Sequence, residues 1–265
     1  MKALISVEFY KLRHTGLVWA AMLIPVGMSM YLALNRNYIY DPEVVRYPWI
    51  NYIGLIAMVG GVRVLAMVIS FIVAYMAAMD FDGLTIQNIL SVGVNRKQYF
   101  FSRLLTYLFL AFAAYGVSTV LFVLCRLYRQ WEQEVYGGSL PLGEFLTVFL
   151  IVYLQFCAYC SIFHMLSFFL KKQSTTLIVT FAWIIAELMS GILKEWFFMG
   201  ADLYDRTVGL VPMMVLQRCG EFIEERTIFT FDFLQCGISA ILIICVTSAV
   251  GYWKFCYTDQ YVGLK

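Results

Sequence analysis

Long apolar runs alternate with short polar connections along the whole chain. Crossing the hydrocarbon core of a bilayer, about 30 Å thick, takes roughly 20 helical residues. The runs that approach or exceed this length are residues 17–34, 53–79, 104–125, 145–170, 175–198 and 233–255. Tyr and Trp gather near several of their ends, as amphipathic rings do at the membrane interface. The pattern predicts an all-α polytopic membrane protein, with six transmembrane helices in a single domain, 1–265.

The segment before the first run is a leader of 16 residues that carries charged side chains. This leader contains Glu8, and no clear small-residue cleavage site follows the run. We therefore expect the first run to be a retained span and not a signal peptide.

A short amphipathic segment separates the second and third runs, at about residues 82–93. At helical spacing one side is apolar and the other is polar. The apolar side carries Leu84, Ile86, Ile89 and Leu90, and the polar side carries Thr85, Asn88 and Ser91. Asp82 is expected to cap the N-terminus of this helix, and Gly93 to end it. The pattern predicts a short helix on the membrane surface.

The longest connection, residues 199–232, lies between the fifth and sixth runs. Its apolar middle, VGLVPMMVLQRC, is too short to span a bilayer, so an interfacial or re-entrant piece is expected. It ends in the acidic stretch EFIEER, which is typical of a solvated face. We expect this connection to lie outside the cell.

Composition agrees with a membrane protein. The residues are 62% hydrophobic and 14% charged, with a mean hydropathy of +0.78. A soluble domain carries about 25% charged residues, so a soluble globular fold is excluded. No basic patch indicates a nucleic-acid partner. Lys and Arg are in a small majority on the connections that include both termini, which predicts that the N- and C-termini are cytoplasmic.

Two charges fall inside predicted spans at similar depth. Arg63 lies within the second span and Glu187 within the fifth. An unpaired charge at that depth is costly, so the two are expected to form a buried pair. They either line a translocation cavity or form a static bridge between helices, and the sequence leaves both open.

Seven cysteines, an odd number scattered mainly through the spans, do not indicate a disulfide framework. Cys157, Cys160 and His164 share one face of the fourth span at helical spacing, which makes them weak candidates for a metal site. Only three ligands are in view, and buried cysteines commonly pack like small apolar residues. No bound metal is therefore expected.

No catalytic constellation stands out, and the phosphate-binding pattern GxxxxGK[ST] is absent from the sequence. No soluble segment is long enough for a nucleotide-binding domain. The chain is therefore expected not to be an enzyme and to bind no cofactor of its own.

The stretch DGLTIQNILSVGVNRKQYFFSR, after the second run, resembles the corresponding loop of ABC-2-type transporter permeases. It is most similar to the small permeases of bacitracin-resistance, lantibiotic-immunity and phenol-soluble-modulin export systems. The positions that match the family pattern are Asp80 or Asp82, Thr85, Ile86, Asn88, Ile89, Leu90, Gly93 and Arg96. Leu84 departs from the pattern by separating Gly83 from Thr85. The stretch EFYKLR at Glu8–Arg13 is similar to the amphipathic interface helix that precedes the first span in this family, which implies an interface helix at 1–16. The layout of six spans is a further point of resemblance.

The resemblance implies a permease subunit of an ABC exporter in a bacterial cell membrane, with ATP and Mg²⁺ bound by a separate ABC ATPase. It implies that the segment at 82–93 is a coupling helix, docked on the ATPase together with the N-terminal helix. The residues expected in this coupling are Asp80, Asp82, Thr85, Asn88, Gly93, Arg96, Glu8 and Lys11.

The further partners implied are a second permease copy or a paralogue, giving a dimer, and membrane lipid. The implied substrate is hydrophobic or amphipathic, such as an antimicrobial or bacteriocin-like peptide. Export or clearance of such a peptide is a resistance or immunity function. The alternative is a membrane sensor or resistance component that binds a peptide or lipid without translocating it.

Overall fold

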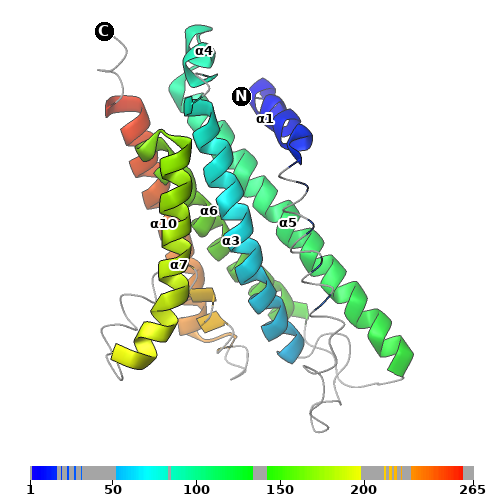
Figure 1. The fold of residues 1–265 in the computed structure, drawn as a ribbon. Coiled ribbons are helices and arrows are strands. Elements are labelled where there is room, and N and C mark those ends of the chain that lie inside the picture. The colour runs from blue at the N-terminus through cyan, green and yellow to red at the C-terminus, as the bar shows by residue number, and fades with distance from the viewer. Residues whose placement is uncertain are drawn as a thin grey trace.

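The computed structural model describes residues 2–16, 52–82, 85–133, 142–197 and 228–258, together with 19, 23, 27, 31, 212, 215, 216, 218, 219 and 222. Throughout this part of the chain the regular structure is helical (Figure 1). The elements are α1 Lys2–His14, α3 Tyr52–Asp82, α4 Thr85–Ser91, α5 Arg96–Gln133, α6 Leu142–Leu170, α7 Gln173–Phe197, α10 Phe231–Trp253 and the π-helical turn η2 Lys254–Thr258.

Helices α3, α5, α6, α7 and α10 occupy the positions of the second to sixth predicted spans. By length and composition, the stretches suited to cross a membrane are Val62–Asp82, Arg96–Cys125, Leu142–Leu170 and Phe231–Tyr257, and α7 contributes a shorter apolar stretch, Gln173–Met189. The first predicted span, 17–34, and much of the connection 199–232 lie outside the described residues. The chain is thus a multi-pass helical membrane protein.

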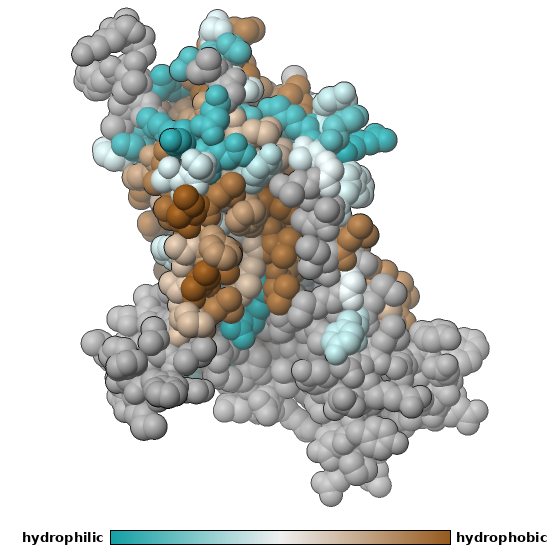
Figure 2. Space-filling view, in the orientation of Figure 1, coloured by the Kyte–Doolittle hydropathy of each residue, from teal (hydrophilic) through white to brown (hydrophobic). Residues whose placement is uncertain are grey.

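One end of the bundle is polar. Helices α1 and α4 and the turn η2 lie at this end (Figure 1). Hydrophilic residues gather there, and hydrophobic residues cover the adjoining surface (Figure 2). We call it the α4 end. An apolar surface next to a polar rim is what a bilayer and its interface require of the side chains that face them.

Helix α6 is the centre of the bundle, since it contacts α3, α5, α7 and α10. Its buried residues run from Val148 to Phe168 and include both the apolar and the polar side chains of that stretch. A helix surrounded by neighbours on several sides can be apolar around most of its circumference, as α6 is.

Helix α5 begins earlier than the hydrophobic pattern predicts, at Arg96 instead of residue 104. Asn95 provides the cap: its Oδ1 accepts a hydrogen bond of 2.9 Å from the backbone N–H of Lys97. The carbonyl of Asn95 accepts the first helical bond, 3.0 Å, from the N–H of Tyr99. The cap extends the helix through the aromatic stretch that precedes the apolar run.

The predicted surface helix is present as α4, with one correction at its start. Helix α3 continues through Asp82, so Asp82 does not precede α4 as its cap. Instead, Asp82 Oδ2 accepts a 3.0 Å hydrogen bond from the backbone N–H of Gln173, the first residue of α7. A carboxylate is stabilised there by the partial positive charge of the helix N-terminus.

The helix stop predicted at Gly93 is confirmed. Gly93 has a φ of 90°, a conformation that side chains other than that of glycine rarely adopt. Its N–H donates a 3.1 Å hydrogen bond to the carbonyl of Leu90. The chain then turns away from α4 and enters α5.

We expect Gly251→Ala to destabilise the bundle by about 1–3 kcal/mol, the usual cost of overpacking. A Cβ at this position would lie 3.1 Å from Phe100 Cζ and 3.3 Å from Met165 Cγ. Gly237→Ala is the matched control on the same helix, because its Cβ would make an ordinary contact of 3.4 Å with Ile151 Cγ1. Thermal unfolding in detergent measures both. Equal unfolding temperatures for the two variants would contradict the close packing at Gly251.

Candidate functional site

Helix α4 rests on an apolar cluster at the α4 end. The buried members of this cluster are Ile86, Tyr99, Phe100, Leu104, Phe168, Phe255 and Cys256. Ile86 is the buried residue of α4, and Ile89 and Leu90 pack against the cluster at its edge. Apolar side chains thus hold this seven-residue helix, which is far too short to be stable alone.

The opposite side of α4 is exposed. Gln87, Asn88 and Ser91 point away from the bundle, and Thr85 is half-buried. Val92, just after the helix, is 84% exposed. The division into an apolar and a polar side agrees with the helical spacing read from the sequence. The exposed amide and hydroxyl groups form a small polar surface, which we call the α4 face: Gln87, Asn88 and Ser91.

Arg96 connects the start of α5 to the last turn of the described chain. Its Nη1 donates a 3.0 Å hydrogen bond to the carbonyl of Phe255 in η2. Its guanidinium also lies 5.7 Å from the centre of the Phe255 ring. Arg96 is therefore half-buried against η2, where it anchors the C-terminal turn beside α4.

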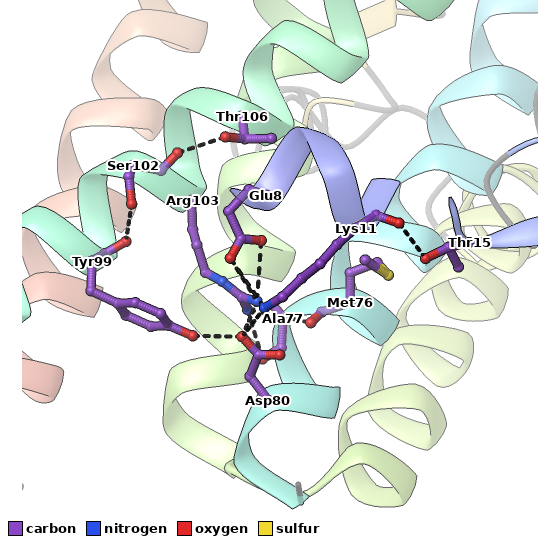
Figure 3. Close-up of polar contacts among 10 residues, drawn as sticks. All are labelled: Glu8, Lys11, Thr15, Met76, Ala77, Asp80, Tyr99, Ser102, Arg103 and Thr106. Carbon is purple, nitrogen blue, oxygen red and sulfur yellow. Dashed lines mark hydrogen bonds and ion pairs between the residues drawn. The ribbon is translucent and has the colours of Figure 1, made fainter. Parts of the chain in front are cut away.

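A group of charged residues joins α1, α3 and α5 just inside the α4 end (Figure 3). Its charged members are Glu8, Lys11, Asp80 and Arg103, and together with the neutral Tyr99 we call them the ion cluster. Arg103 lies against Asp80 in a direct ion pair, and its Nη2 lies 3.3 Å from Glu8 Oε2. Lys11 Nζ lies 3.3 Å from Glu8 Oε1 and 3.4 Å from Asp80 Oδ2. Two carboxylates thus share two cations.

Tyr99 and the backbone of α3 complete the coordination of these charges. Tyr99 Oη donates a 2.8 Å hydrogen bond to Asp80 Oδ2, and the Arg103 guanidinium stands 5.2 Å from the centre of the Tyr99 ring. Arg103 Nη1 donates to the carbonyl of Met76 at 3.3 Å. Buried ions need several such partners, because each has lost its hydration.

Two of the residues expected in coupling, Glu8 and Asp80, are buried in the ion cluster. They are only 4% and 1% exposed. In this structure their carboxylates are enclosed by α1, α3 and α5, so they hold α1 against the bundle. Lys11 is partly exposed at its outer edge.

Sequence reasoning missed Arg103 and Tyr99. With the third span expected to begin at 104, Arg103 falls in the connection before it. With α5 beginning at Arg96, Tyr99 and Arg103 lie four residues apart and so share one helix face. On α1, Glu8 and Lys11 are three residues apart and so share one helix face. This spacing is the corresponding sequence signal for the partners that α1 contributes.

Glu187 forms a second buried polar group, deeper in the bundle. Its Oε2 accepts a 2.6 Å hydrogen bond from Tyr159 Oη on α6, and its Oε1 accepts one of 2.8 Å from Trp183 Nε1 on α7. Arg63, half-buried on α3, interacts with Glu187 electrostatically. The carboxylate therefore links α6 to α7, within electrostatic reach of Arg63 on α3.

We expect Glu187→Gln to destabilise the protein less than Glu187→Leu. Glutamine retains an acceptor oxygen for Tyr159 or Trp183, whereas leucine leaves both donors without a partner, at about 1–3 kcal/mol each. Thermal unfolding of the two variants in detergent gives the order. If the glutamine variant is the less stable, the hydrogen bonds from Tyr159 and Trp183 are not what makes Glu187 stabilising at this position.

Cys157, Cys160 and His164 are all buried on α6. The His164 ring packs among aromatic rings, at 4.8 Å from Phe100 and 4.9 Å from Phe168 between centroids. Among the described residues, no group of three or more His, Cys, Asp or Glu side chains is arranged to hold a metal ion. Packing between the helices accounts for the burial of these three side chains.

Comparison with known proteins adds one positive finding. A family model described as ABC-2 family transporter protein matches residues 4–187, more than half of the chain. The matched range contains most of α1 and all of α3, α4, α5 and α6, and it extends into α7, so it includes both the ion cluster and the α4 face. A search of curated proteins finds no match.

Proposed function

The chain belongs to the ABC-2 transporter family and is a membrane permease component of an ABC transporter, and we propose that it couples a separate ABC ATPase to export. ATP and Mg²⁺ are bound by that ATPase. The ATPase docks on the α4 face of this chain. The two termini and α4 lie on the cytoplasmic side of a bacterial cell membrane, and 199–232 lies outside.

The observation that carries this proposal is the position of α4. The helix projects at one end of the bundle with Gln87, Asn88 and Ser91 exposed, while Ile86 is anchored in the apolar cluster. Because the cluster contains residues of α5, α6 and η2, movement of α4 is transmitted to several spans at once. Packed elements shift between discrete arrangements, so docking at α4 shifts the helix bundle toward one of its arrangements.

The ion cluster supports the participation of α1 in the same movement. Glu8 and Lys11 on α1 are tied to Asp80 on α3 and, through Glu8, to Arg103 on α5. Asp80 is two residues from the end of α3, close to the segment that leads into α4. A displacement of α4 therefore acts on α1 through the ends of α3 and α5. Of the residues expected in coupling, Thr85 and Asn88 contribute through the α4 side, and Gly93 and Arg96 fix its geometry.

The proposed substrate is a hydrophobic or amphipathic molecule, and an antimicrobial or bacteriocin-like peptide is the first choice. Support comes from the resemblance to the small permeases of bacitracin-resistance and lantibiotic-immunity systems. Aromatic residues make up 17% of the chain, which suits an adaptable apolar path. A second permease copy or a paralogue completes the pathway, with lipid around it. The alternative is a resistance sensor that binds a peptide or lipid and moves nothing.

Co-purification from native membranes in mild detergent tests the proposal. We expect an ABC ATPase to accompany the tagged chain in near-equal amount, with ATP hydrolysis above background. A second permease in the same preparation would identify a heterodimer. Recovery of the chain without an ATPase, and with background hydrolysis, would overturn the exporter proposal and favour the sensor.

A further inference from the structure

Helix α7 packs on the bundle through a narrow polar stripe. Within Gln173–Met189 its buried residues are Thr176, Thr180, Ile184 and Glu187, which are three or four residues apart and therefore share one face. Three of these four side chains are polar, although the stretch as a whole is apolar. Ionisable residues inside a membrane commonly mark substrate pathways. Glu187 is the charged member of this stripe, so it is the first candidate for such a role.

Three aromatic rings adjoin the Glu187 carboxylate. Tyr159 Oη and Trp183 Nε1 donate to its two oxygens at 2.6 and 2.8 Å. Phe163 lies between these aromatics, with its ring centroid 4.9 Å from that of Tyr159 and 6.4 Å from that of Trp183. Cations bind over the faces of aromatic rings, most strongly over tryptophan. A carboxylate beside aromatic rings is therefore suited to a cation. We call Tyr159, Phe163, Trp183 and Glu187 the α7 site.

The α7 site has a buried wall and an exposed edge. Tyr159 and Phe163 are 1% and 0% exposed, so they form the wall. Trp183 is 37% exposed and Glu187 is 8% exposed, so a ligand reaches the carboxylate along the indole ring. A carboxylate offers about four lone-pair sites, more than the donors Tyr159 and Trp183 use. A cationic donor can therefore bind while both of these hydrogen bonds are kept.

The α7 site lies well inside the spanning part of α7. Trp183 and Glu187 are ten and fourteen residues after Gln173, about 15 and 21 Å along the helix at 1.5 Å per residue. Tryptophan is favoured at the membrane interface, near water, and at this depth the N–H of Trp183 bonds to Glu187 instead. An ionised carboxylate at such a depth is costly unless a positive charge accompanies it. A ligand that brings a cation therefore gains from the pairing.

The exposed surface of α7 indicates what kind of cation can bind. Its exposed side chains include the apolar residues Phe181, Ile185, Leu188 and Met189. A hard metal ion needs about six oxygen ligands, and the α7 site has a single carboxylate. An amphipathic molecule fits both features, because its apolar part can rest on the apolar surface while its cation reaches Glu187.

We propose that the α7 site binds the side-chain cation of a lysine or arginine in the exported substrate, which is a cationic amphipathic peptide. This inference deepens the proposed function and rests on it, since it assigns a charge to the molecule that is moved. Glu187 pairs with the cation, and the indole of Trp183 covers it. Arg63 on α3 lies within electrostatic reach of the same carboxylate, so it balances that charge when no peptide is bound.

Binding of two synthetic peptides to the purified full chain in dodecyl maltoside, an uncharged detergent, tests the site. The peptides are fluorescent amphipathic helices of one sequence, with lysine in the first and glutamine in its place in the second. We expect the wild type to bind the lysine peptide more tightly in fluorescence anisotropy. Glu187→Gln should weaken binding of the lysine peptide by about tenfold to hundredfold, because it removes a hydrogen bond to a charged group. Its affinity for the glutamine peptide should not change.

Two further variants separate a binding role from a structural one. Glu144→Gln makes the same charge change in the first turn of α6, about 22 Å along that helix from Tyr159, and should bind as the wild type does. Trp183→Leu should weaken binding of the lysine peptide by about threefold to tenfold, since a cation–π contact is lost. Trp183→Phe retains a ring and should lie between Trp183→Leu and the wild type. Thermal unfolding in the same detergent checks that each variant is folded.

The outcomes that overturn this inference differ from those that overturn the exporter. Equal affinity of the wild type for the two peptides, no binding of either, or an unchanged affinity of Glu187→Gln for the lysine peptide would each refute the peptide site. Displacement of the lysine peptide by phosphatidylethanolamine at lower concentration than by unlabelled peptide would assign the site to a lipid amine instead. If the chain still brings its ATPase in these cases, the exporter proposal stands. Charge-selective binding by a chain that recovers no ATPase would keep the site and favour the sensor.

Discussion

Arg103→Leu is expected to destabilise the folded protein by about 3–5 kcal/mol, the usual cost of removing one partner of a buried ion pair. The change leaves Glu8 and Asp80 buried with Lys11 as the remaining cation of the ion cluster. The contacts of Arg103 with the α3 carbonyls are lost as well. Thermal unfolding in detergent, together with the yield of inserted protein, measures the effect.

Arg13→Leu is the matched control, because Arg13 lies on the exposed side of α1, where a single charge contributes little to stability. Arg103→Lys should be intermediate, since lysine keeps the charge but lacks the fork of guanidinium donors. Wild-type stability in Arg103→Leu would contradict the ion cluster.

A double variant distinguishes ion pairing from a general loss of packing. Asp80→Leu with Arg103→Leu removes the buried pair together and leaves Glu8 with Lys11. Replacing both ions of a buried pair by apolar side chains is often neutral, so the double variant should be more stable than Arg103→Leu alone. Additive losses in the double variant would show that the two charges do not depend on each other.

The second large effect is expected at the α4 face. Gln87→Ala with Asn88→Ala should weaken ATPase binding by about tenfold to thirtyfold, since two lost hydrogen bonds contribute about 1 kcal/mol each. Both side chains are exposed, so the thermal stability of the chain should not change. The amount of ATPase recovered with the tagged chain, and transport in cells, are the measurements.

Gln235→Ala is the control for this variant, because Gln235 is an exposed glutamine at the start of α10, far from α4. It should retain both ATPase and transport. If the α4 variant also retains them at the level of the control, the ATPase docks elsewhere. Loss of transport with normal ATPase recovery would place α4 in signal transmission instead of docking.

Features that repeat along a helix were predictable from the sequence alone. The apolar runs located α3, α5, α6, α7 and α10 within a few residues at most ends, because a bilayer demands long apolar helices wherever the chain crosses it. The same periodicity placed Ile86 toward the bundle and Asn88 away from it. Gly93 ended α4 because its backbone conformation suits glycine. Each of these depends on neighbouring residues only.

Partners that lie far apart in the chain were decided by the tertiary structure. Arg103 contacts Asp80 across 23 positions and Glu8 across 95, and no local pattern selects those partners. The same holds for Asp82, whose carboxylate accepts a hydrogen bond from the first residue of α7 and does not cap α4. It also holds for Glu187, whose hydrogen-bond donors are Tyr159 and Trp183. A buried charge pairs with whichever partner lies beside it in the packed bundle, because an unpaired buried charge has a higher free energy than a paired one. Sequence periodicity therefore located the helices, and the packing of the helices determined which charged residues contact one another.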